Sequence, residues 1–156
     1  MIDVKQVLDR TFSVLLIDWP NTELPRTLLN FGFSVFGFSP NGFTKAELSD
    51  ERPDKMDQCS VFSPTPQQQG FLIFRPIETA PLHVDLVHVF RPPEELETII
   101  TTVVSRLTAE TIWLQPPIVS VEARQIAERE NVVFVEGVDI IEAIRETGVS
   151  RSAATQ

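Results

Sequence analysis

Residues 84–120 read VDLVHVFRPPEELETIITTVVSRLTAETIWLQPPIVS, and this stretch decides the fold. Two short apolar runs, 84–90 and 111–115, each end at a proline-marked segment, and residues 93–107 between them have helical spacing. Strand–helix–strand units of this kind form parallel sheets, which bind ligands beyond the carboxyl ends of their strands. The search for function therefore starts with the residues that directly follow each strand.

Four more apolar runs of strand length occur in the chain: residues 13–18, 33–38, 70–74 and 132–135. Further helical patterns occupy residues 3–10, 24–31, 119–130 and 140–146. Continuously apolar strands that alternate with helices are typical of a parallel sheet covered on both faces. We therefore predict one Rossmann-like α/β domain of three layers over residues 1–148, with a mostly parallel sheet of about five or six strands.

Two segments do not fit this alternation. Residues 42–70 are polar and contain three prolines, so we expect a long, irregular and partly mobile insertion. The tail 149–156 has almost nothing to bury and is expected to be disordered.

The composition narrows the possible partners. The chain has 22 acidic and 13 basic residues, a net charge of -9, and no cluster of basic residues, which argues against nucleic acid. The single cysteine, Cys59, excludes an internal disulfide and a cysteine-based metal cluster. No apolar run approaches the roughly 20 residues that span a bilayer, and the first residues lack a signal-peptide pattern, so we expect a cytoplasmic protein with no membrane contact.

Several short motifs carry a family resemblance. They are Val-Phe-Arg at 89–91, Pro-Glu at 93–94, Trp-Leu-Gln at 113–115 and Glu-Ala at 122–123. With the looser Gly-Phe at 32–33 and Phe-Ser-Pro at 38–40, the chain resembles the small CoA-binding Rossmann domain family over roughly residues 12–136, apart from the insertion. That family includes the N-terminal domain of the succinyl-CoA synthetase alpha subunit.

The resemblance implies a stand-alone domain that binds CoA or a related adenine nucleotide across its strand ends. The phosphates are expected against the first strand–helix loop and the adenine near the loop after the second strand. We assign no catalytic residue and no metal ligand. The candidate cofactor-binding residues are Trp19, Asn21, Thr22, Arg26, Ser39, Pro40, Asn41, Phe90, Arg91, Gln115 and Pro116.

The first loop departs from the family pattern. Family members carry a glycine-rich turn there, whereas this chain has Asp18-Trp19-Pro20-Asn21 and no glycine before Gly32. Glycine lets the backbone approach a pyrophosphate closely. A carboxylate that faces a phosphate at about 4 Å costs on the order of 1–4 kcal/mol. Unless Asp18 points away, we expect weakened phosphate binding.

Each main candidate also has a structural alternative. Arg26 either reaches a phosphate beside a helix start or is an ordinary solvated arginine. Arg91 either contacts an anionic ligand or forms a salt bridge with Glu94 or Glu95. Gln115 either binds ligand or ties down the facing loop.

Two smaller groups have alternatives of their own. Ser39, Pro40 and Asn41 either recognise ribose or adenine or form a plain β-turn. His83 and His88 are five residues apart, so strand alternation places them on opposite faces and excludes a shared metal. We expect His88 to be a core histidine.

Three functional hypotheses follow. The first is a non-catalytic binding module for CoA or a related nucleotide, for which Arg26 and Arg91 should converge on one cleft with Asp18 turned aside. The second is a ligand-free interaction protein, for which Trp19 or the insertion should fill that cleft. An NAD- or acyl-CoA-dependent enzyme ranks third, because we find no nucleophile–base pair and no GxGxxG turn. A homodimer through an edge strand at 71–74 is a further expectation.

Overall fold

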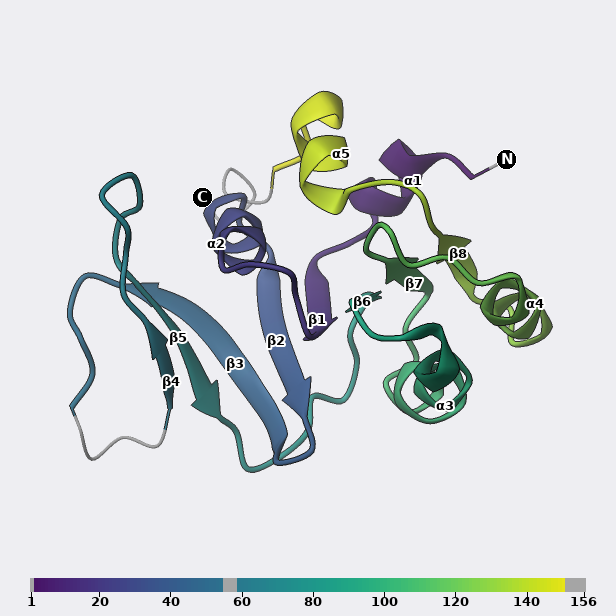
Figure 1. Ribbon diagram of the computed structural model, residues 1–156, viewed down its shortest axis with the longest axis horizontal. Coiled ribbons are helices and arrows are strands. Elements are labelled where there is room, and N and C mark those ends of the chain that lie inside the picture. Colours follow the sequence, from purple (N-terminus) through teal and green to yellow (C-terminus); the bar gives the residue numbers. More distant parts are fainter. Residues whose placement is uncertain (1, 55–58, 151–156) are drawn as a thin grey trace.

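The computed structural model describes residues 2–54 and 59–150 of the chain. Its centre is one eight-stranded sheet with the strand order β4-β5-β3-β2-β1-β6-β7-β8 (Figure 1). The strands, in chain order, are β1 (Ser13–Ile17), β2 (Ser34–Ser39), β3 (Gly42–Ser49), β4 (Ser60–Phe62), β5 (Phe71–Pro76), β6 (Leu86–Val89), β7 (Thr111–Leu114) and β8 (Val133–Val135).

The helices are α1 (Val4–Asp9), α2 (Glu23–Asn30), α4 (Val121–Arg129) and α5 (Ile140–Thr147), together with a mixed helical segment between β6 and β7. That segment begins as a 3-10 turn (Pro93–Glu95), continues as α3 (Leu96–Thr98) and widens into a π-helical stretch (Ile99–Val104). The six predicted strands and the five predicted helices are thus all present.

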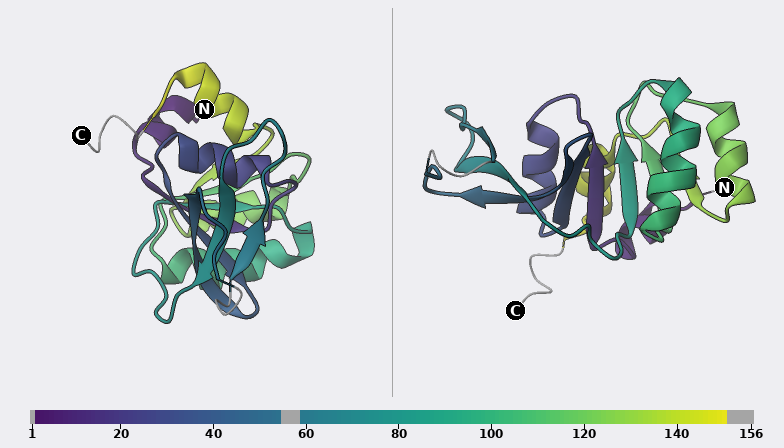
Figure 2. Two further views of the ribbon diagram at one scale, coloured as in Figure 1. Left: turned by 90° about the vertical axis from the view of Figure 1, so that its left-hand side faces the viewer. Right: turned by 90° about the horizontal axis from the view of Figure 1, so that it is seen from below.

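The sheet has a parallel half and an antiparallel half. Strands β2, β1, β6, β7 and β8 run parallel, and β1 pairs with β2 as predicted, with Val14 opposite Val35. Strands β3, β4 and β5 pair antiparallel with their neighbours. In Figures 1 and 2 these antiparallel strands extend to one side, away from α3 and α4.

The prediction of five or six strands is therefore wrong, and so is the irregular insertion at 42–49 and 60–62, which form β3 and β4; residues 55–58 of that predicted insertion lie outside the described residues. Residues 42–49 form β3, which pairs with β2 on one side and with β5 on the other. A strand with neighbours on both sides satisfies its backbone groups even where its side chains are polar and half-exposed. Strand β5 lies between β3 and β4, so the expected edge at 71–74 is also wrong; the edges are β4 and β8.

Helices cover both faces of the parallel half, which gives the predicted three layers (Figure 2). Along β1, Val14 and Leu16 face a core shared with α1, α2 and α5. Leu15 and Ile17 face the opposite core, shared with the mixed helical segment and α4. Strand β1 ends at Ile17, so the next residue, Asp18, lies at the carboxyl end of the strand.

The remaining fold predictions concern the tail and the membrane. Val149 is buried in the core, and residues 151–156 of the predicted disordered tail lie outside the described residues. Within 2–54 and 59–150, none of the helices has the length and apolar character needed to cross a bilayer.

Candidate functional site

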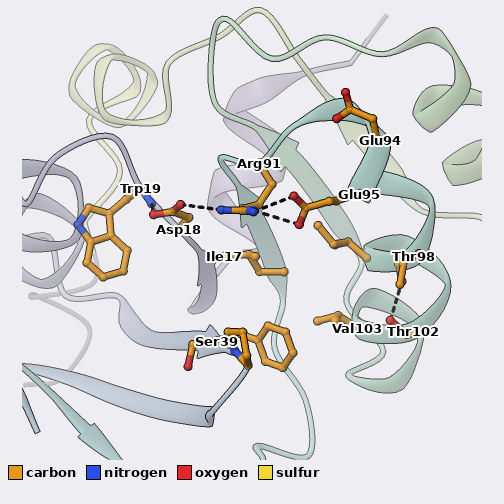
Figure 3. Close-up of a pocket in the computed structure, with 13 residues that line it drawn as sticks. Ile17, Asp18, Trp19, Ser39, Arg91, Glu94, Glu95, Thr98, Thr102 and Val103 are labelled. Carbon is orange, nitrogen blue, oxygen red and sulfur yellow. Dashed lines mark hydrogen bonds and ion pairs between the residues drawn. The ribbon is translucent and has the colours of Figure 1, made fainter.

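A pocket of about 740 Å³ opens at the carboxyl ends of β1 and β2 and beside Arg91, two residues after the end of β6. Strand β1 pairs with β2 on one side and with β6 on the other, so the strand order reverses at β1. Open α/β sheets bind ligands in the crevice at such a reversal. The volume is in the usual range for a small-molecule site. The lining residues are Ile17, Asp18, Trp19, Phe38, Ser39, Pro40, Arg91, Glu94, Glu95, Thr98, Ile99, Thr102 and Val103 (Figure 3).

The walls of the pocket are apolar and its rim is charged. Ile17 and Phe38 come from strand ends, and Ile99 and Val103 come from the π-helical stretch. The ionisable lining residues are one arginine and three carboxylates: Arg91, Asp18, Glu94 and Glu95. With all four ionised, the rim has two more negative than positive charges.

Asp18 directs its carboxylate toward Arg91 rather than away from the site (Figure 3). Its Oδ1 accepts a hydrogen bond from the backbone N–H of Trp19 at 2.8 Å, and its Oδ2 lies 3.2 Å from Nη1 of Arg91. Its φ of 66° is in the left-handed region that favours glycine, asparagine and aspartate. The loop after β1 therefore has a glycine-like backbone at this residue without a glycine.

Arg91 lies between two carboxylates. Its Nε and Nη2 donate to the two carboxylate oxygens of Glu95 at 3.1 and 2.7 Å, and Nη1 donates to Asp18. The hydrogen bonds that Arg91 donates to Glu95 and then to Asp18 raise the pKa of Arg91 above its ordinary value. The predicted salt bridge of Arg91 is confirmed with Glu95, whereas Glu94 points away from the guanidinium in Figure 3.

Arg26 lies elsewhere. It is only 2% exposed, and its guanidinium donates to the backbone carbonyls of Phe62 at 3.0 Å, Gly70 at 2.9 Å and Gln69 at 3.4 Å. The expectation of a solvated arginine is therefore wrong. The two arginines do not converge on one cleft either, because Arg26 connects α2 to the main chain of β4 and of the turn before β5.

The other candidates in the first loop mainly stabilise it. Trp19 forms part of the pocket wall, and its ring stacks on Phe74 with centroids 4.8 Å apart. Asn21 accepts a hydrogen bond from the backbone N–H of Leu24 at 3.3 Å, and Thr22 is the residue that begins α2. Neither Asn21 nor Thr22 lines the pocket.

The predicted residues after β2 form a tight hairpin whose tip borders the pocket. Ser39 pairs with Gly42, so Pro40 and Asn41 make a two-residue loop, as the β-turn alternative predicted. The backbone N–H of Asn41 donates to Oγ of Ser39 at 3.2 Å. Ser39 and Pro40 line the pocket, and Asn41 does not.

The predicted residues after β6 and β7 lie outside the pocket lining, apart from Arg91. The backbone N–H of Phe90 donates to the carbonyl of Ile17 at 3.0 Å and so extends the β1–β6 pairing. Strand β7 ends at Leu114 and is followed by Gln115 and then by Pro116, which is joined to Pro117 by a cis peptide bond.

Gln115 is buried and belongs to a polar chain in the core. Its Nε2 donates to Oδ2 of Asp139 at 3.0 Å, and its Oε1 accepts from Nε2 of His88 at 2.9 Å. Because Asp139 precedes α5, the amide fixes the facing loop, which was the second alternative. His88 is completely buried, as expected of a core histidine, and burial lowers its pKa to about 4.

Most residues of the helical wall were not predicted as site residues. Thr98, Ile99, Thr102 and Val103 follow Glu95 at intervals of three, four, seven and eight residues. This spacing places all of them on one helical face. Arg91 and Glu95 were already named as a possible pair, so extending the face from Glu95 would have found this wall.

Comparisons with solved structures find the same fold in small proteins from thermophiles. A Thermus thermophilus protein, cell-free ID.343, is 14% identical with a TM-score of 0.61, over 94% of this chain and 99% of that chain. A hypothetical protein from Pyrococcus horikoshii OT3 is 16% identical with a TM-score of 0.62, over 93% and 89%. The redesigned protein Prb is 14% identical with a TM-score of 0.64, over 96% and 93%.

No curated protein matches this chain. The family model described as a CoA binding domain matches residues 58–142, which is more than half of the sequence. The matched region includes Arg91, Glu95 and the helical wall of the pocket, but not β1 or β2. The chain belongs to the CoA-binding domain family.

Proposed function

We propose that the protein is a non-catalytic binding module whose pocket holds CoA or a related adenine nucleotide. The observation that carries this proposal is the position of the pocket, at the carboxyl ends of β1 and β2 beside Arg91, in a chain of the CoA-binding domain family. The partner is accordingly a small molecule.

The side chains that line the pocket support binding rather than catalysis. Its described lining residues include no histidine, cysteine or lysine. The pKa of Arg91 is raised by its hydrogen bonds to Glu95 and Asp18, so Arg91 stays charged. A general base or an activated nucleophile needs a group that exchanges its proton near neutral pH.

The pocket is also open, which favours a binding module over a ligand-free interaction protein. The interaction hypothesis expects Trp19 or residues 42–70 to fill the cleft. Instead Trp19 stacks on Phe74 and contacts Phe62 edge-on, with about 740 Å³ left beside it. The apolar wall around Ile99 and Val103 suits an uncharged part of the ligand.

The test is a calorimetric titration of the protein with CoA, acetyl-CoA, NAD and ATP. We expect CoA to bind with a dissociation constant in the micromolar range. Arg91→Ala removes the one cation among the described lining residues, so CoA should bind about tenfold more weakly.

Arg145→Ala is the matched control, because Arg145 is exposed on α5 and does not line the pocket. It should bind CoA like the wild type. The proposal is wrong if none of the four compounds binds, or if Arg91→Ala and Arg145→Ala bind CoA equally well.

A further inference from the structure

We propose that Asp18 is the specificity-determining residue of the pocket. Its carboxylate acts as an internal anion in the phosphate-binding position of the β1–α2 loop. The loop therefore selects against phosphate and for ligands whose facing part is uncharged. This inference rests on the proposed function, and names the chemical class that the same pocket prefers.

The first support is that two backbone donors of the loop and the helix start are already occupied. A loop that binds a pyrophosphate directs free backbone N–H groups at it. Here the N–H of Trp19 donates to Oδ1 of Asp18 at 2.8 Å, and the N–H of Leu24 donates to Asn21 at 3.3 Å. An incoming phosphate must displace the chain's own oxygens from these two groups.

The second support is that each of the three guanidinium nitrogens of Arg91 already donates to a carboxylate. Glu95 takes two of its N–H groups, and Asp18 takes a third at 3.2 Å. A phosphate that approaches Nη1 of Arg91 must therefore displace the Asp18 carboxylate or lie beside it. At about 4 Å, two like charges in an intermediate dielectric change an affinity by a factor between about five and a thousand.

The third support is the backbone of Asp18, which allows the carboxylate to be removed without strain. Its φ of 66° suits asparagine and glycine at least as well as aspartate. Glu95 contacts Arg91 through separate nitrogen atoms and should still orient the guanidinium in such a variant. Asp18→Asn and Asp18→Gly should therefore fold and leave Nη1 of Arg91 available to a ligand.

The experiment compares CoA with pantetheine, the phosphate-free part of CoA, by calorimetry on the wild type, Asp18→Asn and Asp18→Gly. Both variants should bind CoA at least about tenfold more tightly than the wild type. Their affinity for pantetheine should stay within about twofold of the wild-type value, because no phosphate is present. Thermal unfolding checks that each variant is folded.

Asp9→Asn is the control for the loss of one carboxylate. Asp9 pairs with Lys5 at 3.0 Å on α1 and does not line the pocket, so this variant should bind both compounds like the wild type. If the Asp18 variants gain affinity for CoA and not for pantetheine, the inference holds, and the affinity of the wild type for CoA then decides the proposed function by itself.

Two other outcomes separate this inference from the proposed function. If the wild type binds CoA and both Asp18 variants bind it equally or more weakly, Asp18 does not determine specificity and the proposed function stands. The same conclusion follows if CoA and pantetheine gain equally, because charge is then not the cause. If neither the wild type nor any of the variants binds CoA, both proposals are wrong.

Discussion

Arg26 and Arg91 were both expected at one ligand, and the structure gives them opposite environments. Arg26 is 2% exposed, and its guanidinium contacts backbone carbonyls between α2 and the β4–β5 pair. The side chain of Arg91 is 38% exposed, and its guanidinium contacts carboxylates at the rim of an open pocket. The same type of side chain thus joins two segments of main chain at Arg26 and lines an open pocket at Arg91.

The difference shows how burial and partner type decide the use of a charged group. Backbone carbonyls are fixed in place, so Arg26 lies where those carbonyls need a donor, and its loss leaves partly buried acceptors unpaired. Water can solvate carboxylate side chains near the surface, so breaking the contacts of Arg91 costs the folded protein little stability. The following predictions test this contrast, beginning with the largest expected effect.

Arg26→Met should cause the largest loss of stability. The substitution keeps an unbranched side chain of similar length but removes the donors to the carbonyls of Phe62 and Gly70. Hydrogen bonds to charged groups contribute about 1.5–3 kcal/mol each, so we expect the free energy of unfolding to fall by about 3 kcal/mol or more. Urea denaturation measures this. A loss below about 1 kcal/mol would show that the buried arginine is not structural.

His88 extends the contrast to a buried neutral group. Its pKa is lowered from 6.5 to about 4 by burial, so between these values the unfolded chain binds a proton that the folded chain does not. The contribution of neutral His88 to stability is therefore fully present above about pH 7 and is lost as the pH decreases. Linkage gives a loss of about 3 kcal/mol between pH 7 and pH 4 from this group.

The measurement is urea denaturation of the wild type and His88→Gln at several pH values between 7 and 4. Glutamine keeps a donor for Oε1 of Gln115 but does not titrate. Subtracting one curve of unfolding free energy against pH from the other removes the contributions of the carboxylates and of His83, because both proteins contain these groups. The free energy of unfolding of the wild type minus that of His88→Gln should decrease by about 3 kcal/mol from pH 7 to pH 4. If the free energies of the two proteins fall equally with pH, the prediction is wrong.

The parallel half of the fold was predictable because its strands are buried on both faces. Continuous apolar runs such as 13–17 and 111–114 have few alternatives to a central strand. Strand β3 was missed because only Ala46 among its residues is buried, so its composition resembles a loop. The signal that was available is Asn41-Gly42, a dipeptide typical of hairpin turns, directly after a predicted strand.

The site was predictable in part for a related reason. Ser39, Pro40 and Arg91 come after the predicted strands 33–38 and 84–90, and the carboxyl ends of the parallel strands β1, β2 and β6 meet at one edge of the sheet. Arg26 was misplaced because its partners belong to a strand and a turn in the segment taken for an insertion. An arginine's acceptors are set by tertiary pairing, so the missed strands and the misplaced side chain have one cause.

The smallest expected effect is the loss of stability in Arg91→Ala. Its partners Glu95 and Asp18 are 45% and 49% exposed, and water can solvate both carboxylates when the arginine is removed. Exposed ion pairs contribute up to about 1 kcal/mol, so the free energy of unfolding should change by no more than that. Urea denaturation beside Arg26→Met makes the comparison direct. If Arg91→Ala destabilises the protein as much as Arg26→Met does, then Arg91 is as structural as Arg26.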